Sequence, residues 1–178
     1  MKTITLAPVI NVRSYMKAYF SIVFIICCMI CNAQTSATAN FTASVTIVEP
    51  IAISTTSNMN FASIDAKSGG EVTITPGDAR LTSGGVELKD ATGASAASFE
   101  VKGQKGFTYS ISLPENEQIL TNGSESIIIK NFVSDFTSGS LADGSHVIKV
   151  GATLDIAPNQ IPGIYRSSGA MPVTVNYN

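Results

Sequence analysis

Apolar and polar residues alternate with a period of two along most of the chain from residue 34 onward. That period is typical of β-strands with one buried face, whereas an amphipathic helix repeats its apolar residues every three to four positions. The two clearest alternations are ANFTASVTIV at residues 39–48 and VTVNY at residues 173–177. We expect a strand in each segment. Their apolar faces carry Phe41, Ala43, Val45 and Ile47 in the first segment, and Val173, Val175 and Tyr177 in the second.

The part of the chain between these segments also shows strand patterns, separated by Gly and Pro turn signals. The apolar run at residues 126–136 predicts a central strand with both faces covered, and residues 96–114 predict a hairpin. In a further strand, every second residue from Ile148 to Ile156 is expected to face the core. Nine or ten strands without a helical period predict a single all-β domain with an immunoglobulin-like β-sandwich fold.

The beginning of the chain differs from the alternating part. Basic residues precede an apolar run at residues 18–30, which is the order of a secretory signal peptide. The run is shorter than the ~20 residues that a membrane-spanning helix needs. We therefore predict a signal peptide at residues 1–33 and a β-sandwich domain at residues 34–178, with either Met1 or Met16 as the start. The basic residues are Lys2, Arg13 and Lys17.

The composition after residue 33 restricts the partners of the domain. All three cysteines precede residue 34, so the domain has no disulfide and no thiolate. Without the leader's three basic residues, eight Lys and Arg stand against 13 Asp and Glu, a net charge of about −5. Such a chain is a poor partner for nucleic acid or for an anionic membrane surface, since both select basic proteins. We expect no nucleic-acid partner and no membrane span once the signal peptide is removed.

Several segments together carry a family resemblance. TASVTIVEPIAIS, NFASID, GFTYSISLP and GATLDIAPNQIPGIYRSSGAMPVTVNYN cover nearly the whole domain. The most specific feature is a G-x-Y followed by V-T-V-x-Y, here Gly163, Tyr165, Val173, Thr174, Val175 and Tyr177. In these features the chain resembles the DUF4402 family of bacterial exported proteins. That family has no assigned activity, so the resemblance implies a fold and export from the cell but no chemistry.

A weaker likeness connects the two terminal alternations to pilin subunits that are assembled by a chaperone and an usher. Such subunits have an incomplete immunoglobulin-like fold, which the N-terminal extension of a neighbour completes by strand addition. Here residues 39–48 would be the donated strand and residues 173–177 the strand that a periplasmic chaperone recognises. Only seven residues, 34–40, precede Phe41, so one segment would serve as both donor and first strand. The first and last strands of a closed sandwich show the same alternation, and both interpretations stay open.

Residues with catalytic or metal-binding chemistry form no recognisable motif. His146 is the only histidine and lacks the G-x-S-x-G context of a nucleophile; we expect a solvated ring at the start of a strand. The carboxylates at residues 115–117 and 135–143 are too sparse for a calcium loop. We therefore predict no catalytic residue, no metal site and no cofactor.

These features predict an exported, non-enzymatic protein in the periplasm, at the cell surface or outside the cell. The first hypothesis is a pilin-like structural or adhesive subunit that pairs with copies of itself, with other surface subunits or with a periplasmic chaperone. The second is a monomeric periplasmic or secreted binding module for a glycan or a protein, with loops 115–126 and 134–145 as its contact surface. The third is a hydrolase with two unrecognised catalytic carboxylates.

Overall fold

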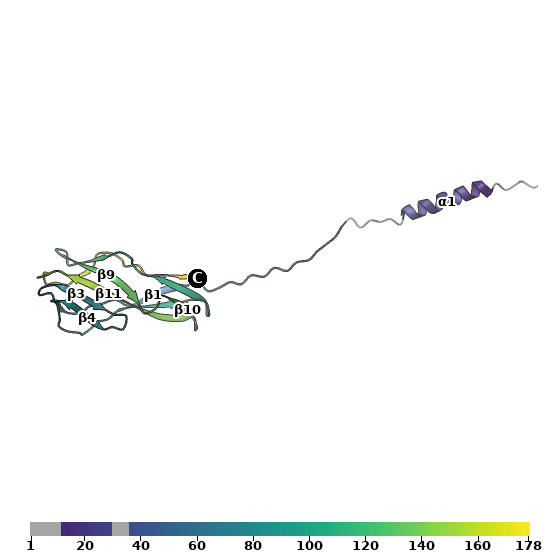
Figure 1. Ribbon diagram of the computed structural model, residues 1–178. Helices are drawn as coiled ribbons and strands as arrows, with labels where there is room; N and C mark the ends of the chain where they lie inside the picture. The colour runs from purple at the N-terminus through teal and green to yellow at the C-terminus, as the bar shows by residue number, and fades with distance from the viewer. Residues whose placement is uncertain (1–11, 30–35) are drawn as a thin grey trace, which may run out of the picture. The chain divides into compact units, whose positions relative to one another are not determined.

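The computed structural model describes residues 12–29 and 36–178 (Figure 1). The chain divides into two compact units, Met1–Val45 and Thr46–Asn178. The predicted cleavage site before Gln34 lies outside the described residues, as does Lys2. The division into a signal peptide and a mature domain therefore stays a prediction.

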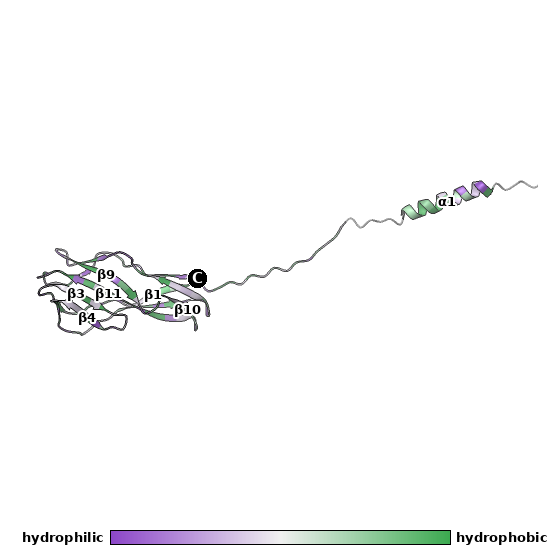
Figure 2. Cartoon of the chain, viewed as in Figure 1, coloured by the Kyte–Doolittle hydropathy of each residue, from purple (hydrophilic) through white to green (hydrophobic). Residues whose placement is uncertain are grey.

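The first unit contains one described helix, α1 (Val12–Met29). Figure 2 shows that α1 is hydrophilic near its beginning and hydrophobic toward its end, because Arg13 and Lys17 precede the apolar run. Neither α1 nor any other helix within the described residues has the length and apolar character needed to cross a membrane.

The second unit is built from antiparallel strands that form a sandwich-like domain. Nine of the thirteen described strands have four residues or more, and the others are shorter. The largest sheet has eight strands, ordered β1-β6-β11-β9-β8-β12, with β3 and β4 joined to it through β11. Its strands are β1 (Ala52–Ser57), β3 (Gly70–Ile74), β4 (Arg80–Gly84), β6 (Ala97–Lys102), β8 (Gln118–Thr121), β9 (Ser126–Ser134), β11 (Ser145–Ile156) and β12 (Arg166–Ser167).

Two smaller sheets complete the domain. One has the order β10-β7-β13 and the other pairs β2 with β5. The predicted all-β sandwich is therefore confirmed, while its immunoglobulin-like detail stays a prediction. The strands of the smaller sheets are β2 (Ile64–Asp65), β5 (Glu87–Leu88), β7 (Thr108–Ser112), β10 (Ser138–Ser140) and β13 (Thr174–Tyr177).

Strand β11 is the longest strand and organises the large sheet. Its first half pairs with β6 and its second half with β3, while β9 runs along its other edge. The change of partner falls at Gly151, where a Cβ atom would lie 2.1 Å from the carbonyl oxygen of Ile74. A glycine is needed there because any side chain would collide with that backbone. The prediction for the inward face of β11 is confirmed, since Ile148, Val150, Ala152, Leu154 and Ile156 are all buried.

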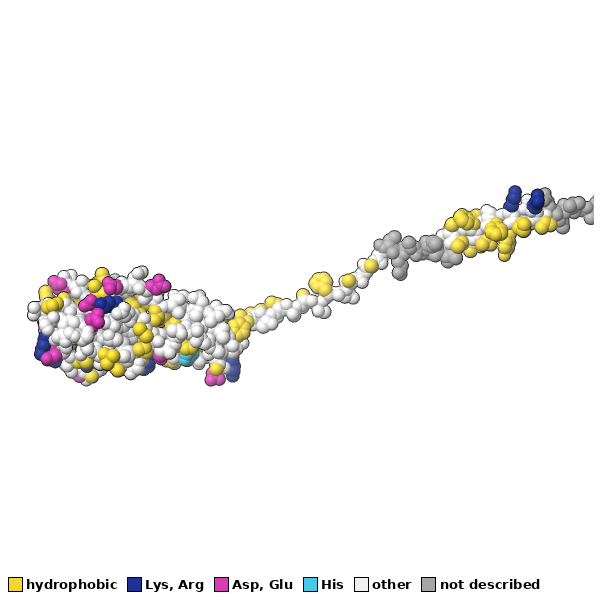
Figure 3. Space-filling model, in the orientation of Figure 1, with side chains coloured by type: hydrophobic (Ala, Val, Ile, Leu, Met, Phe, Trp, Pro, Cys, Tyr) yellow, Lys and Arg dark blue, Asp and Glu magenta, His cyan; other side chains and the backbone are white. Residues whose placement is uncertain are grey.

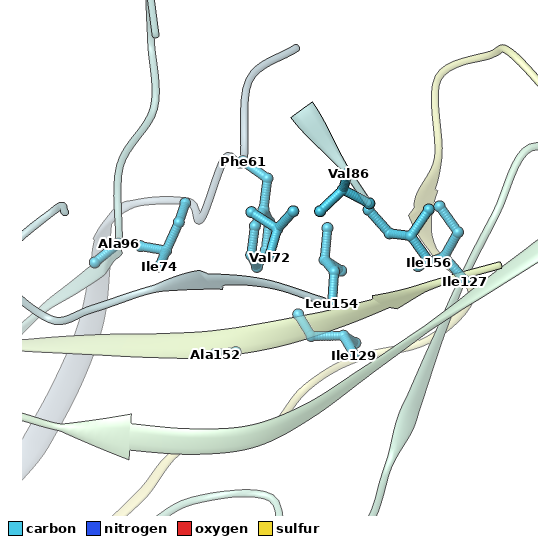
Figure 4. Packing of buried hydrophobic residues seen from close by; sticks show 10 residues of the cluster. All are labelled: Phe61, Val72, Ile74, Val86, Ala96, Ile127, Ile129, Ala152, Leu154 and Ile156. Atoms are coloured by element: carbon cyan, nitrogen blue, oxygen red, sulfur yellow. The ribbon is translucent and has the colours of Figure 1, made fainter. Parts of the chain in front are cut away.

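The core consists of two hydrophobic clusters, and β11 contributes to both. The first cluster gathers side chains from β3, β9 and β11 with Phe61 and Val86 (Figure 4). The second cluster contains Val101, Tyr109 and Val175 and lies between the large sheet and the β10-β7-β13 sheet. Ile148 belongs to this second cluster, whereas Leu154 belongs to the first.

Two details of the sequence prediction are wrong. Residues 96–114 do not form a hairpin, because β6 belongs to the large sheet and β7 to the β10-β7-β13 sheet. The loop between them crosses from one layer to the other. Strand β9 is central in its sheet as predicted, but its outer face is open: Ile128 and Val133 are exposed. An antiparallel sheet in a two-layer fold covers only one of its faces.

The strand expected at residues 39–48 is also not formed. Residues 36–51 belong to no strand, and the first strand of the domain is β1, which begins at Ala52 after Pro50. An isolated alternating segment has no neighbouring backbone to complete its hydrogen bonds, so alternation alone cannot order it.

Candidate interaction site

Strand β13 has the alternating exposure that the sequence predicts. Val175 is buried and its neighbours Thr174 and Asn176 are exposed. The other two apolar positions, Val173 and Tyr177, are half-buried. Val175 and Tyr177 both pack in the second core cluster. The structure therefore brings the C-terminal set of predicted partner-strand residues onto one face.

The hydroxyl group of Tyr177 connects the last strand, β13, by hydrogen bonds to the backbone just before β1. The backbone N–H of Gln104 donates to this oxygen at 2.6 Å, and the hydroxyl donates to the carbonyl of Glu49 at 2.9 Å. The N–H of Glu49 in turn donates to Oε1 of Gln104 at 3.2 Å. A Cβ atom on Gly103 would lie 2.2 Å from the Tyr177 oxygen, so a side chain at residue 103 would displace this hydroxyl group. These contacts fix the chain immediately before β1.

The N-terminal set of predicted partner-strand residues lies in residues 36–48, which are exposed throughout. Phe41 is 91% exposed, Val45 86% and Ile47 89%, and Ala43 is also exposed. Hydrophobic side chains are spaced along this segment in Figure 3. The segment itself belongs to no strand.

The domain contains a large apolar groove that sequence reasoning missed. Its volume is about 1420 Å³, and its walls are segments 58–67 and 159–173. The floor is the core face of the large sheet. Thr55 of β1 also lines it. The signal in the sequence was the stretch PNQIPGIYRSSGAMP, which is apolar but too rich in Gly and Pro to supply a covering strand. Floor residues include Phe99, Ile129, Phe132, Val150, Leu154 and Ile156.

Charged residues near the groove are largely paired with one another. Glu87 binds Lys67 and Lys89, and Lys89 also lies 3.2 Å from Asp65. The hydrogen bond from Lys67, followed by that from Lys89, lowers the pKa of Glu87 to about 2. On the domain face that Figure 3 displays, acidic and basic side chains are interspersed with uncharged ones. Apolar groups therefore make up the larger part of the groove's lining, with Asp65, Lys67 and Lys89 ion-paired at its edge and Arg166 as a further basic side chain.

His146 is not the solvated histidine that the sequence suggests. Its Nδ1 atom lies 2.7 Å from the Tyr109 hydroxyl, and its ring packs edge-on against Phe136 with 4.5 Å between centroids. Burial, and then the charge of Asp135, raises the pKa of Tyr109 to about 12. The ring of His146 is half-buried and packs with Tyr109 and Phe136 beside the second core cluster. Among the residues that the structure describes, no three His, Cys, Asp or Glu side chains are grouped to hold a metal ion.

Comparison with known proteins gives one match. The family model described as Domain of unknown function (DUF4402) matches residues 51–177, which is more than half of the chain. The match begins immediately before β1 and ends at Tyr177, so residues 39–48 precede it. Neither the curated proteins nor the solved structures give a match. The chain thus belongs to the DUF4402 family, as its sequence predicts.

Proposed function

We propose that this protein is an exported, non-enzymatic surface subunit of the pilin type, with a structural or adhesive role. Residues 39–48 of one subunit would pair as a β-strand with a neighbouring subunit. The observation that supports this best is the exposure of Phe41, Val45 and Ile47 on one face of a segment that belongs to no sheet. An exposed apolar face costs free energy in water, about 25 cal/mol for each Å² that a partner would otherwise cover.

The sheet edges of the domain support the same proposal. Within the described residues, β1, β4, β10, β12 and β13 each have a strand on one side only, as do both strands of the β2-β5 pair. An unpaired edge offers N–H and C=O groups to any extended chain that reaches it. Strand addition uses those groups for affinity and uses alternate side chains for specificity. Strand β13 would also be the edge that a periplasmic chaperone covers before assembly.

Export is part of the proposal because strand exchange between subunits builds a surface fibre only outside the cytoplasm. The basic residues followed by an apolar run at residues 18–30 support a cleaved signal peptide. The domain holds no cysteine, so it needs no oxidising step to fold. The protein would act in the periplasm, at the cell surface or outside the cell.

The test is the electrophoretic size of the exported protein in detergent, loaded with and without boiling. Strand-exchanged polymers unfold slowly, so the unboiled sample should show a ladder that collapses to a monomer band on boiling. Changing Phe41, Val45 and Ile47 together to Asp should abolish the ladder. The matched control changes Thr42, Ser44 and Thr46 to Asp, which adds the same charge to the polar face and should preserve the ladder. A single monomer band for the unmodified protein in both lanes contradicts the proposal.

A second candidate function is a monomeric periplasmic or secreted binding module for a glycan or a protein. The groove favours this alternative, because binding sites for ligands are concave and mostly apolar. The same electrophoresis separates the two candidates. A binding module would run as a monomer before and after boiling, and its groove would then be the surface to screen for ligands.

A further inference from the structure

We infer that the groove is the acceptor site for residues 39–48 of a second copy of this chain. This inference rests on the proposed function and adds to it the surface that receives the donated strand. Strand exchange by itself does not specify which edge receives the donated strand, since β1, β4, β10 and β13 all have an unpaired edge within the described residues. The geometry points to the opening between β1 and β13.

Strands β1 and β13 are tied together at one end and lead into the groove at the other. Tyr177, the last residue of β13, binds the carbonyl of Glu49 just before β1. At the opposite ends, Thr55 of β1 and Val173, next to β13, both line the groove. An entering strand therefore meets free backbone groups on two sheet edges and an apolar floor beneath them.

The side chains of the floor suit the apolar face of the segment. Phe99 and Phe132 are half-buried and line the groove beside the buried Val150. In an extended chain, alternate side chains on one face are about 6.7 Å apart, so the face from Phe41 to Ile47 is about 20 Å long. The polar face would stay in water. The segment carries no charge between Ser36 and Val48, and Asp65, Lys67 and Lys89 beside the groove form ion pairs.

The size of the groove favours a polypeptide over a small molecule. Pockets for small ligands measure about 300–1,000 Å³, and this groove has a volume of about 1420 Å³. Segments 58–67 and 159–173 cover the floor incompletely because neither forms a strand of more than two residues. One added strand would supply the missing part of the second layer.

The anchor at Glu49 favours a second copy over the segment of the same chain. The N–H and C=O of Glu49 are both used, by Gln104 and Tyr177, and Pro50 has no N–H to donate. The residue before a proline is also biased toward an extended backbone. A tight turn at residues 48–50 that returned the segment into its own groove would break these contacts.

The test introduces cysteines into full-length chains that carry tags of different size and are co-expressed. One chain carries Val45→Cys and the other Val173→Cys at the groove, or Thr82→Cys on the competing edge strand β4. We expect a disulfide-linked heterodimer, seen without reducing agent after boiling, with Val173→Cys and at least tenfold less with Thr82→Cys. The unmodified chain shows the background from Cys27, Cys28 and Cys31. A link to Thr82→Cys alone overturns the groove as acceptor while strand exchange stands.

A second variant adds a bulky ring to the lining of the groove. Gly169 lines it, and a Cβ atom there would meet nothing within 4 Å, so Gly169→Trp projects a large ring without backbone strain. We expect this variant to lose the detergent-resistant ladder and to keep its urea midpoint, while Thr82→Trp keeps both. A ladder that persists in Gly169→Trp overturns the inference. A monomer band for the unmodified chain instead removes the proposed function itself.

Discussion

The layer that faces the large sheet differs between the two ends of the sandwich. At the closed end, the β10-β7-β13 sheet covers it, and Tyr109, Leu141 and Ile148 are completely buried. At the open end, the covering layer consists of the two-residue strands β2 and β5 with segments 58–67 and 159–173, and the groove remains. Core side chains are buried at both ends, including Val72 at the open end, so the difference lies in the groove that the irregular cover leaves above them.

Strand β11 makes this comparison direct because it runs through both ends. Its inward side chains are buried along the whole strand, from Ile148 at the closed end to Leu154 and Ile156 at the open end. What differs is the packing above them. Interiors gain much of their stability from close contact on all sides, so a side chain beside unfilled space contributes less.

The largest expected effect is a difference between two truncations in β11. Ile148→Ala at the closed end should lower the free energy of unfolding by about 4 kcal/mol, and Leu154→Ala at the open end by about 2–3 kcal/mol, within the usual range for such changes. At the closed end, the tightly packed neighbours of Ile148 cannot move into the cavity that the truncation leaves. At the open end, Leu154 already borders the unfilled space of the groove, so its truncation removes fewer contacts. Urea denaturation measures both values.

The control for this pair is Val147→Ala on the outer face of the same strand. Val147 is 55% exposed, so its truncation should cost no more than about 0.5 kcal/mol. Equal losses for Ile148→Ala and Leu154→Ala would mean that the groove does not loosen the packing of its floor, and the contrast between the two ends would fail.

A smaller effect is expected from Tyr177→Phe, which tests how much the hydrogen bonds of the Tyr177 hydroxyl stabilise the closed end. The change keeps the ring, which packs edge-on against Phe107, and removes only the hydroxyl. The N–H of Gln104 and the carbonyl of Glu49 both lose their partner. We expect a loss of about 1–2 kcal/mol. Amide hydrogen exchange at Gln104 should accelerate while exchange in β3, at the open end, stays unchanged. Uniform acceleration would show a global effect instead.

The sequence predicts faces well because alternation reports which side chains are buried together. The inward face of β11 and the alternation in Val173, Val175 and Tyr177 follow from the period of two, and the structure confirms both. The predicted family is confirmed as well. These features depend only on local spacing along one strand.

Alternation does not report the partner of a strand, and the errors have this common cause. Strands β6 and β7 look like a hairpin, yet they lie in different layers because their connection crosses the sandwich. Residues 39–48 show the pattern of a strand, yet they belong to no strand. The groove was missed for the same reason, since it results from a covering layer that segment 159–173 does not complete.

The smallest expected effect concerns Glu87, at the open end, whose pKa is lowered to about 2 by its hydrogen bonds to Lys67 and then Lys89. The ordinary pKa of about 4.5 applies to the unfolded chain, so protonation favours unfolding. The carboxylate therefore adds stability above pH 4.5 and loses it as the pH falls toward 2. Because the group is exposed, water and salt screen the ion pairs.

Glu87→Gln should lower the urea midpoint at pH 7 slightly, and the difference from the unmodified chain should vanish near pH 2. Glu117→Gln, in an exposed loop with no described salt bridge, is the control and should show no difference at either pH. A Glu87→Gln effect that is equally large at pH 7 and pH 2 would mean that the side chain acts through packing at β5 and not through its charge.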